Sequence, residues 1–242
     1  MGDSQTAETA GLLSDYERWR SSELGRITDH IEEEVIVALV EPVFGKRVLD
    51  VGCGDGLLSA RLAQEGAQMI GIDNDPRMLD AARRRAGGAK FRPTFVGGSA
   101  EALPFPDGLF DIVVAITVLC LLSDPEKAFR EMSRVLRPGG RIVIGELGRH
   151  SLWAAKRRVA GWFGSITWRS ARFRTSGDLK ELAQAAGLEV EAIRGAVYYP
   201  PCNRCARWLA RFDRRLSRLT TFGAAFVALA ARKPHPSAEV RP

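Results

Sequence analysis

VLDVGCGDG, residues 48–56, joins an apolar run typical of a buried strand to three glycines within five positions. Glycine has no Cβ, so a ligand can approach the main chain closely at such positions. In an open sheet of parallel strands, ligands bind outside the carboxyl ends of the strands. The stretch therefore predicts a first strand that is followed directly by a ligand-binding loop.

Strand-like and helix-like segments alternate along the rest of the chain. The apolar runs predict strands over residues 47–51, 68–73, 90–98, 110–116 and 141–147. Helical spacing and capping residues predict helices over residues 15–43, 57–67, 76–88 and 124–136. After an insertion we expect helices over residues 175–188 and 207–219, and strands over residues 189–199 and 221–233. This alternation favours an α/β fold in which a mostly parallel sheet carries helices on both faces.

The chain is expected to fold as one domain behind a short tail. Residues 1–14 are small and polar, which predicts a disordered tail. Residues 15–242 are expected to form a single domain, with a ligand-binding core over residues 45–147 and an insertion plus C-terminal elements over residues 148–220. Because the insertion after the fifth strand is aromatic, basic and without strand alternation, we expect it to be helical and to cover the site.

The composition is that of an ordinary globular protein, with 242 residues of which 45% are hydrophobic and 26% charged. No apolar run approaches the ~20 residues that a membrane-spanning helix needs. The first residues, MGDSQTAETA, have neither a basic start nor an apolar stretch, so no secretory signal is expected. The cysteines form no dense framework, which indicates a reducing, cytoplasmic setting; they are Cys53, Cys120, Cys202 and Cys205.

Charge is distributed unevenly along the chain. Residues 1–148 carry 17 Lys and Arg against 23 Asp and Glu, whereas residues 149–242 carry 18 against 6. The basic C-terminal part is expected to meet an anionic partner, unless its arginines simply keep surface helices in solution. No RNA-binding module is recognisable, so nucleic acid is not the expected partner.

Residues 207–219, RWLARFDRRLSRL, predict a basic amphipathic helix. Its apolar face consists of Trp208, Leu209, Phe212, Leu216 and Leu219, and five arginines lie around the other face. Such a helix either packs on the sheet through its apolar stripe or contacts an anionic membrane surface.

The spacing of the glycines separates two classes of ligand. A dinucleotide site favours G-x-G-x-x-G, whereas Gly52–Gly56 has the spacing G-x-G-x-G, with Asp50 two residues before it. A carboxylate there would repel a diphosphate and suits a ligand with an ammonium or sulfonium charge. Asp73, 19 residues beyond Gly54, can accept hydrogen bonds from ribose hydroxyls or can cap the helix that begins near Pro76.

Four stretches occur in order over about residues 45–147: VLDVGCGDG, GIDNDPRML, GSAEALPFPDGLFDIVVAITVL and RVLRPGGRIVIGE. Together they resemble the S-adenosylmethionine-dependent methyltransferases with a Rossmann-like fold, in particular the small-molecule type similar to ubiquinone/menaquinone-biosynthesis methyltransferases. The resemblance implies a seven-stranded sheet ending in an antiparallel β-hairpin strand. It also implies S-adenosylmethionine as cofactor and methyl transfer to a small-molecule acceptor, which a lipid-like or quinone-like compound would fit.

The resemblance also implies roles for individual residues. Asp50 would lie near the amino group of the cofactor, and Asp73 would hold the ribose hydroxyls. The methionine part would lie along Gly52, Cys53 and Gly54. The other residues implied in cofactor binding are Asn74 and Met78 beside the adenosine, Ser99, Ala100 and Glu101 around the adenine, and Ile116 and Thr117 at the reacting centre.

The acceptor side lacks an evident catalytic base. The stretch AITVLCLL after the fourth predicted strand has neither an Asn/Asp-Pro-Pro-aromatic motif nor the His pair of close relatives. The acceptor is therefore already nucleophilic, or a base comes from elsewhere, for which the candidates are Glu146, His150 and Tyr16. Candidate contacts with the acceptor are Tyr16 and Trp19, in a segment that folds over the pocket in similar enzymes, and Tyr198 and Tyr199.

Two other functional classes are weighed beside the methyltransferase. A non-catalytic S-adenosylmethionine-binding or membrane-peripheral partner protein would explain the missing base. An NAD(P)-dependent oxidoreductase is disfavoured by the glycine spacing and by the lack of a Tyr-x-x-x-Lys pair. No metal is expected, because Cys202 and Cys205 have no second ligand pair and a structural zinc site needs four ligands.

Overall fold

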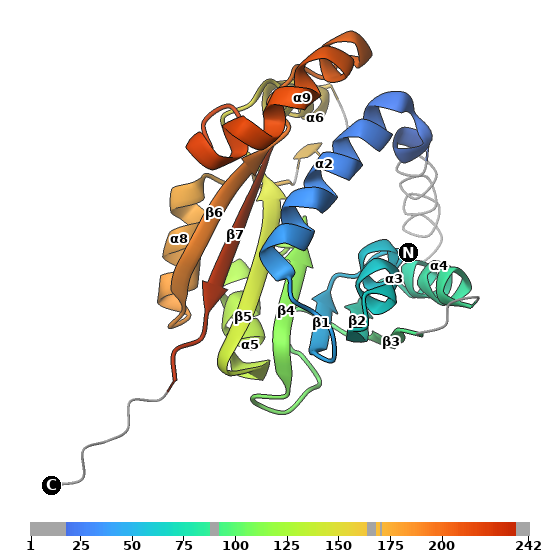
Figure 1. Cartoon of the computed structure of the whole chain (residues 1–242), viewed down its shortest axis with the longest axis vertical. Coiled ribbons are helices and arrows are strands. Elements are labelled where there is room, and N and C mark those ends of the chain that lie inside the picture. Colours follow the sequence, from blue (N-terminus) through green and yellow to red (C-terminus); the bar gives the residue numbers. More distant parts are fainter. Residues whose placement is uncertain (1–17, 88–91, 164–167, 170, 236–242) are drawn as a thin grey trace, which may run out of the picture.

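The computed structural model describes residues 18–87, 92–163, 168–169 and 171–235. Seven strands form one sheet in the order β3-β2-β1-β4-β5-β7-β6 (Figure 1). The strands are β1 (Arg47–Val51), β2 (Gln68–Asp73), β3 (Thr94–Gly97), β4 (Phe110–Ile116), β5 (Leu136–Leu147), β6 (Glu189–Ala196) and β7 (Phe226–Arg232). Neighbouring strands from β3 to β5 run parallel, and β7 pairs antiparallel with both β5 and β6. The predicted α/β class, with a seven-stranded, mostly parallel sheet and an antiparallel final strand, is confirmed.

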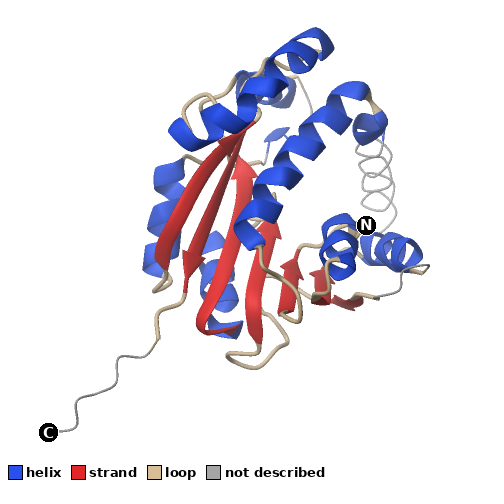
Figure 2. Cartoon of the chain, viewed as in Figure 1, coloured by secondary structure: helices blue, strands red, loops and turns tan. Residues whose placement is uncertain are grey.

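Helices cover both faces of this sheet (Figure 2). The helices with described bounds are α2 (Glu23–Val40), α3 (Leu57–Gln64), α4 (Pro76–Ala86), α5 (Pro125–Val135), α6 (Leu152–Trp162), α8 (Ser176–Ala185) and α9 (Asn203–Leu219). Buried side chains of α2, α3 and α9 pack on one face, and those of α5 and α8 pack on the other. No helix in the described ranges is long and apolar enough to cross a membrane.

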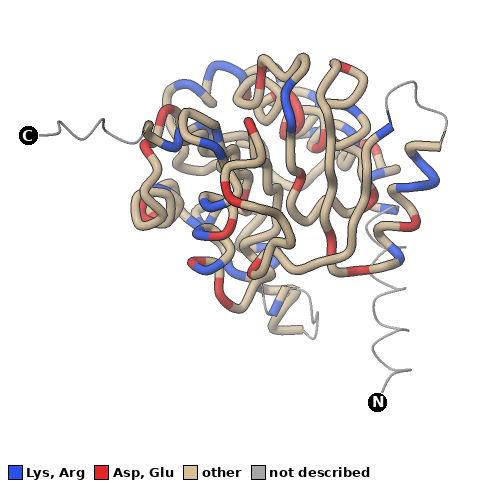
Figure 3. The backbone as a smooth tube through the Cα atoms, turned by 90° about the horizontal axis from the view of Figure 1, so that it is seen from below, with Lys and Arg blue, Asp and Glu red and all other residues tan. Residues whose placement is uncertain are grey.

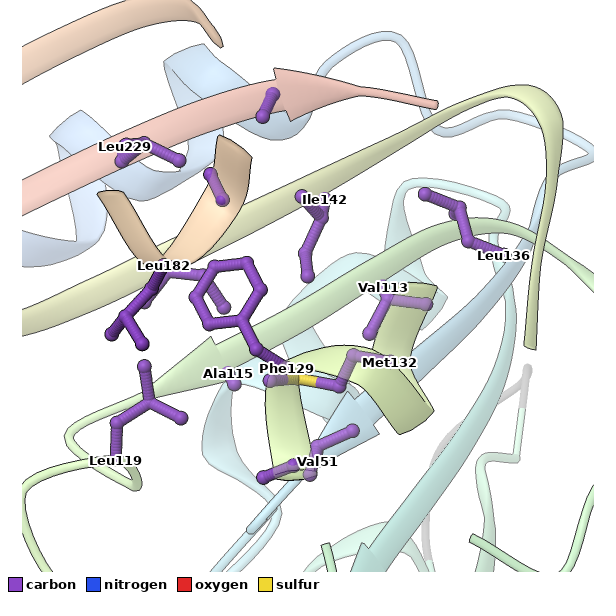
Figure 4. Close-up of a cluster of buried hydrophobic side chains, with 14 of the residues drawn as sticks. Val51, Val113, Ala115, Leu119, Phe129, Met132, Leu136, Ile142, Leu182 and Leu229 are labelled. Carbon is purple, nitrogen blue, oxygen red and sulfur yellow. The ribbon is translucent and has the colours of Figure 1, made fainter. Parts of the chain in front are cut away.

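The core has two layers because successive strand residues point to opposite faces. Leu49 of β1 lies beside Val113 of β4, which lies beside Ile142 of β5, and all three belong to the layer under α5 and α8. Figure 4 shows Val113 and Ile142 in this layer. Their neighbours along each strand point toward α2 and α3. The central strands are therefore apolar along almost their whole length, as expected for parallel strands covered on both faces.

Several element boundaries differ from the predicted ones for local reasons. β3 begins only after Pro93, which has no N–H to donate to a ladder. β5 begins at Leu136, before the RPGG turn, with a register shift against β4. α9 begins at Asn203 rather than at residue 207, because Cys202 caps it. The predicted tail at residues 1–14 lies outside the described residues, and the division into core and insertion stays a prediction.

The order of the strands in the sheet indicates where the ligand site lies. β1 lies between β2 and β4, so the connections that leave β1 and β4 diverge to opposite sides. In open α/β sheets a crevice forms at the carboxyl ends of the strands where the order reverses in this way. The loops after β1 and β4 are therefore the ones to inspect.

α9 is attached to the sheet through one buried carboxylate. Asp213 is 2% exposed, and its side chain accepts hydrogen bonds from the main-chain N–H groups of Val197, at 2.8 Å, and Tyr198, at 3.0 Å. Val197 has a positive φ of 61°, where a residue with a side chain is strained. The carboxylate thus holds the turn after β6 in an unfavourable conformation.

Asp213→Ala is expected to lower the free energy of unfolding by roughly 2–4 kcal/mol, because two buried main-chain donors lose their acceptor. Urea unfolding followed by circular dichroism measures the change. Asp80→Ala is the matched control, since exposed Asp80 forms a surface ion pair with Arg83, and it should cost less than about 0.5 kcal/mol. Equal losses in the two variants would contradict the proposed role of Asp213.

Candidate active site

The three glycines after β1 have distinct surroundings. All have positive φ, with values of 67° for Gly52, 53° for Gly54 and 73° for Gly56. A Cβ on Gly52 would lie 2.4 Å from the side chain of Val118, and one on Gly56 would lie 2.8 Å from that of Ala82. A Cβ on Gly54 would meet nothing within 4 Å. Two glycines thus permit close packing, and Gly54 exposes its main chain to open space where a ligand can lie.

Asp73 at the end of β2 is bound to this glycine loop. Its Oδ2 accepts a hydrogen bond from the N–H of Gly54 at 2.9 Å, and its Oδ1 accepts one from the N–H of Asp75 at 2.9 Å. Asp75, and not Asp73, caps α4, by accepting from the N–H of Arg77. A carboxylate offers about four lone-pair positions, so Asp73 can still accept hydrogen bonds from hydroxyl groups.

Asp50 and Cys53 are both buried beneath the loop. The Asp50 carboxylate accepts a hydrogen bond from the hydroxyl of Ser59 at 2.6 Å, and burial raises its pKa to about 6. A nearby cation would favour its ionised form. Cys53 packs against Leu79 and Phe95, and burial raises the pKa of its thiol, so it is placed as a packing residue and not as a nucleophile.

The segment after β3 is fastened to the start of α5. Ser99 accepts a hydrogen bond from the N–H of Glu101 at 3.1 Å, and Ala100 is buried in the main core. The Glu101 carboxylate accepts from the N–H of Asp124 and from the hydroxyl of Ser123, each at 3.0 Å, and these bonds lower its pKa. These hydrogen bonds hold Ser99 and Glu101 in place beside the carboxyl end of β3.

The predicted residues on β4 and α4 lie at the same edge of the sheet. β4 ends at Ile116, and Thr117 adopts a positive φ of 55° while its N–H donates to the carbonyl of Gly145 at 2.7 Å. Asn74 is exposed directly after β2, and Met78 is half-buried in the first turn of α4. The cofactor-binding residues expected from the sequence therefore all lie at or beside the carboxyl ends of β1, β2, β3 and β4.

Glu146 fixes the turn after β4. Its buried Oε1 accepts a hydrogen bond from the N–H of Leu119 at 2.7 Å. Burial raises the pKa of Glu146 to about 7, and the nearby Arg174 opposes this rise. Because its carboxylate accepts a hydrogen bond from a main-chain N–H group, Glu146 is suited to hold in place the turn that carries Thr117.

The other candidates for the acceptor side lie around this edge. His150 is exposed, with its ring 6.1 Å from that of Phe222. Tyr199 is buried and its hydroxyl lies 3.0 Å from that of Thr28, which places it in the packing between β6 and α2. Tyr198 is half-buried, with its hydroxyl bonded to the carbonyl of Thr220. Their part in acceptor binding stays a prediction.

The N-terminal segment is joined to the glycine loop by ion pairs. Tyr16 lies outside the described residues, and Trp19 is half-buried against the core layer under α2. Arg20 contacts Asp29 of α2 at 2.7 Å and Asp55 of the glycine loop at 3.2 Å. An open cavity of about 380 Å³ lies beside these groups. An ion pair thus joins the segment that was predicted to cover the pocket to the glycine loop.

Glu32 of α2 and Arg157 of α6 are two half-buried charged residues that the sequence analysis did not single out. Burial raises the pKa of Glu32 to about 8, and the charge of Arg157 opposes this rise. The Arg157 guanidinium lies over the rings of Trp153, at 5.3 Å, and Trp168, at 4.8 Å. Trp168 packs against the cluster that contains Cys120, so Arg157 lies close to the turn that follows β4.

A signal for Glu32 was present in the sequence. Glu32 comes four residues after Thr28, so both side chains lie on the face of α2 that points to the protein interior. A carboxylate on an inward helical stripe needs a partner or a function. Arg157 gave no comparable signal, because its inward orientation depends on the two tryptophans between which it lies.

The Cys202–Cys205 pair was also not predicted in its observed form. The two cysteines form a disulfide across the first turn of α9, and Cys202 accepts a hydrogen bond from the N–H of Cys205. The described ranges contain no group of His, Cys, Asp and Glu that could hold a metal ion.

Comparisons with known proteins agree with this geometry. A family described as "Methyltransferase domain" matches residues 49–144. The ubiquinone biosynthesis O-methyltransferase of Idiomarina loihiensis is 34% identical over 65% of this chain and 68% of its own length. The demethylmenaquinone methyltransferase of Clavibacter sepedonicus is 45% identical over 44% of this chain and 43% of its own length.

Solved structures show the same fold. An S-adenosylmethionine-dependent methyltransferase from Thermotoga maritima superposes with a TM-score of 0.70 at 24% identity, covering 91% of this chain and 95% of that one.

The open space at Gly54, the carboxylate of Asp73 and the acidic Asp50 fit a ligand with a ribose and a positive charge. These findings confirm the predicted family, enzyme class and cofactor over the oxidoreductase and the non-catalytic partner protein. The chain belongs to the S-adenosylmethionine-dependent methyltransferases.

Proposed function

We propose that this methyltransferase acts on a small lipid-like or quinone-like acceptor that carries an ionisable hydroxyl group. The observation that supports this acceptor best is Glu32, a half-buried carboxylate whose raised pKa of about 8 suits a proton acceptor. The names of two relatives, which refer to ubiquinone biosynthesis and to demethylmenaquinone, point to the same class of acceptor.

We assign the cofactor to the glycine loop and the end of β2. The main chain at Gly54 would contact the methionine part, Asp73 would accept hydrogen bonds from the ribose hydroxyls, and Asp50 would favour the positive charge. When bound, S-adenosylmethionine supplies a methyl group on a sulfonium, which becomes a neutral thioether once the methyl carbon is bonded to the acceptor. The segment after β3, with Ser99 and Glu101, would border the adenine.

We assign the acceptor to the region beside Glu32 of α2, Arg157 of α6 and the turn after β4. Arg157 favours the ionised form of Glu32, and the Glu32 carboxylate then takes the proton that the acceptor hydroxyl gives up and becomes neutral as the acceptor oxygen bonds to the methyl carbon. Glu146 holds the turn that carries Thr117 and so orients the acceptor toward the methyl group. In this arrangement Glu32 supplies the base that the segment directly after β4 lacks.

We further infer that the protein works in the cytoplasm at the periphery of an anionic membrane. A lipophilic acceptor resides in membranes, so an enzyme that acts on it gains from lying against one. The basic helix α9, with six arginines and one acidic residue, supports this location.

The acceptor class is tested by methyl transfer from S-adenosylmethionine with a labelled methyl group. Purified protein is incubated with quinols that bear a free hydroxyl group, with fully methylated quinols, and with amine and thiol compounds. We expect label in the lipid-soluble product only for quinols with the free hydroxyl. Transfer confined to amines or thiols would contradict the proposed acceptor while leaving the methyltransferase class intact.

Glu32→Gln is expected to lower kcat about 10²–10⁴-fold with unchanged cofactor affinity, because the variant cannot accept the proton. The wild-type rate should rise with pH through about 8, as the carboxylate with raised pKa ionises, and fall away below it. Glu33→Gln is the matched control, since Glu33 pairs with Arg61 on the surface. A Glu32→Gln enzyme with the wild-type rate and pH profile would exclude Glu32 as the base.

Gly54→Ala is expected to weaken binding of S-adenosylhomocysteine about 10–100-fold, because the added methyl group projects into the space assigned to the cofactor. Gly45→Ala is the matched control: Gly45 also has a positive φ and open space around its Cβ, but it precedes β1 at the other end of the sheet. Both variants should lose about 1–2 kcal/mol of stability. Calorimetric titration measures the affinities, and equal affinities would refute the assignment.

A further inference from the structure

Exposed apolar side chains gather at one end of the molecule. Among the described residues, the exposed large apolar side chains at this end are Leu121, Leu152, Val159, Trp162, Phe163, Trp208, Leu209, Phe212, Leu219 and Phe222. They belong to segments that follow β4, β5 and β6 or precede β7, so topology brings them to the edge at which the parallel strands end (Figure 1). At the other end of the sheet, Phe44 is an exposed aromatic residue that stands apart from this group.

α9 packs on the protein through its polar and small residues. Ala206, Asp213 and Ser217 are its buried positions, spaced as one helical stripe, and Ala210 between them is half-buried. The apolar face points outward instead, with Trp208 67% exposed. The interpretation that this helix packs on the sheet through its apolar stripe is therefore wrong. Asp213 explains the orientation, because two main-chain donors in the turn after β6 bind its carboxylate.

α6 adds a second set of exposed aromatic residues. It buries Trp153 and Ala154, whereas Trp162 at its end is 82% exposed and Phe163 after it is 88% exposed. α6 and α9 both lie beyond the carboxyl ends of the strands, at the end drawn uppermost in Figure 1. We call the exposed faces of residues 152–163 and 203–219 together the α6–α9 surface.

The charge on the α6–α9 surface has one sign. The two helices carry nine Lys and Arg and a single acidic residue, Asp213, which is buried. Arg157 is half-buried among tryptophan rings, and Arg207 and Arg214 form ion pairs with Glu23 and Glu34 of α2, which leaves six other exposed basic residues on the two helices. Arg211 lies across the aromatic side chains, 5.8 Å from the ring of Trp208 and 4.8 Å from that of Phe212. Positive and negative positions are interspersed at the opposite end of the molecule, which is seen from below in Figure 3.

We propose that the α6–α9 surface docks on an anionic lipid bilayer. Aromatic and leucine side chains enter the boundary between head groups and acyl chains, and arginines beside them bind lipid phosphates. A second copy of this chain fits the surface poorly, because it would set arginines against arginines. A partner protein would need acidic groups among apolar pockets, whereas a bilayer offers both chemistries over its whole area.

Docking in this orientation has a consequence for the acceptor. The α6–α9 surface lies at the same edge of the sheet as the turn after β4, and Arg157 belongs to α6 itself. The membrane would therefore face the side on which a lipophilic acceptor arrives. This last step rests on the proposed lipophilic acceptor, but docking itself does not, so the acceptor class and docking can fail separately.

The test is co-flotation of the purified full chain with lipid vesicles. One set contains phosphatidylcholine alone, and the other contains equal parts of phosphatidylcholine and phosphatidylglycerol. We expect the protein to float with the anionic vesicles at low salt and to be released at high salt. The double variant Trp208→Glu with Phe212→Glu should bind at least about tenfold more weakly, because it removes two apolar anchors and adds negative charge.

Phe44→Glu is the matched control, since Phe44 is 83% exposed but lies at the other end of the sheet. Circular dichroism and binding of S-adenosylhomocysteine establish that each variant is folded. Docking is overturned if the wild-type protein stays unbound with anionic vesicles at low salt, or if Phe44→Glu weakens binding as much as the double variant. Self-association at rising protein concentration that the double variant abolishes, without vesicle binding, would assign the surface to a second copy instead.

Discussion

The hydrogen bond from the N–H of Gly54 to the carboxylate of Asp73 joins the ends of β1 and β2 at the point on which the site depends. It holds the glycine loop in a series of positive φ angles that leaves the main chain at Gly54 open. Asp73 keeps lone pairs that can accept further hydrogen bonds beside this loop. Because Gly52 and Gly56 pack against neighbouring side chains, the loop cannot move without disturbing α4 and the turn after β4.

The residues that we assign to the acceptor side, and the residue that anchors α9, are charged side chains on helices that are distant in sequence. Glu32 comes from α2, Arg157 from α6 and Asp213 from α9. The Arg157 guanidinium lies over tryptophan rings, and Asp213 accepts hydrogen bonds from main-chain donors. Asp213 also turns the apolar face of α9 outward, so the packing of α9 exposes the surface that we assign to lipid.

The order of elements and the cofactor motif could be predicted because both are local: apolar runs, caps and glycine spacing are read within a dozen residues. Other features could not. The glycine spacing does not predict that, of the three loop glycines, only Gly54 faces open space. Gly52 and Gly56 are packed against Val118 and Ala82, which belong to other parts of the chain. The amphipathic pattern of α9 does not indicate which face is buried, because one carboxylate and its two main-chain donors in the turn after β6 decide it. The surroundings of Glu32 and Arg157 depend on the tertiary fold, because the two residues lie on helices that are distant in sequence.

The most direct test of the account is calorimetric titration of the protein and of Asp73→Ala with S-adenosylhomocysteine, with NADH as the comparison ligand. The account predicts binding to the wild-type protein, a loss of at least about tenfold in Asp73→Ala, since hydrogen bonds to a charged group contribute about 1.5–3 kcal/mol, and no binding of NADH. Equal affinity of the folded variant, or no binding of S-adenosylhomocysteine by the folded wild-type protein, would contradict the central assignment of the glycine loop and Asp73 to the cofactor.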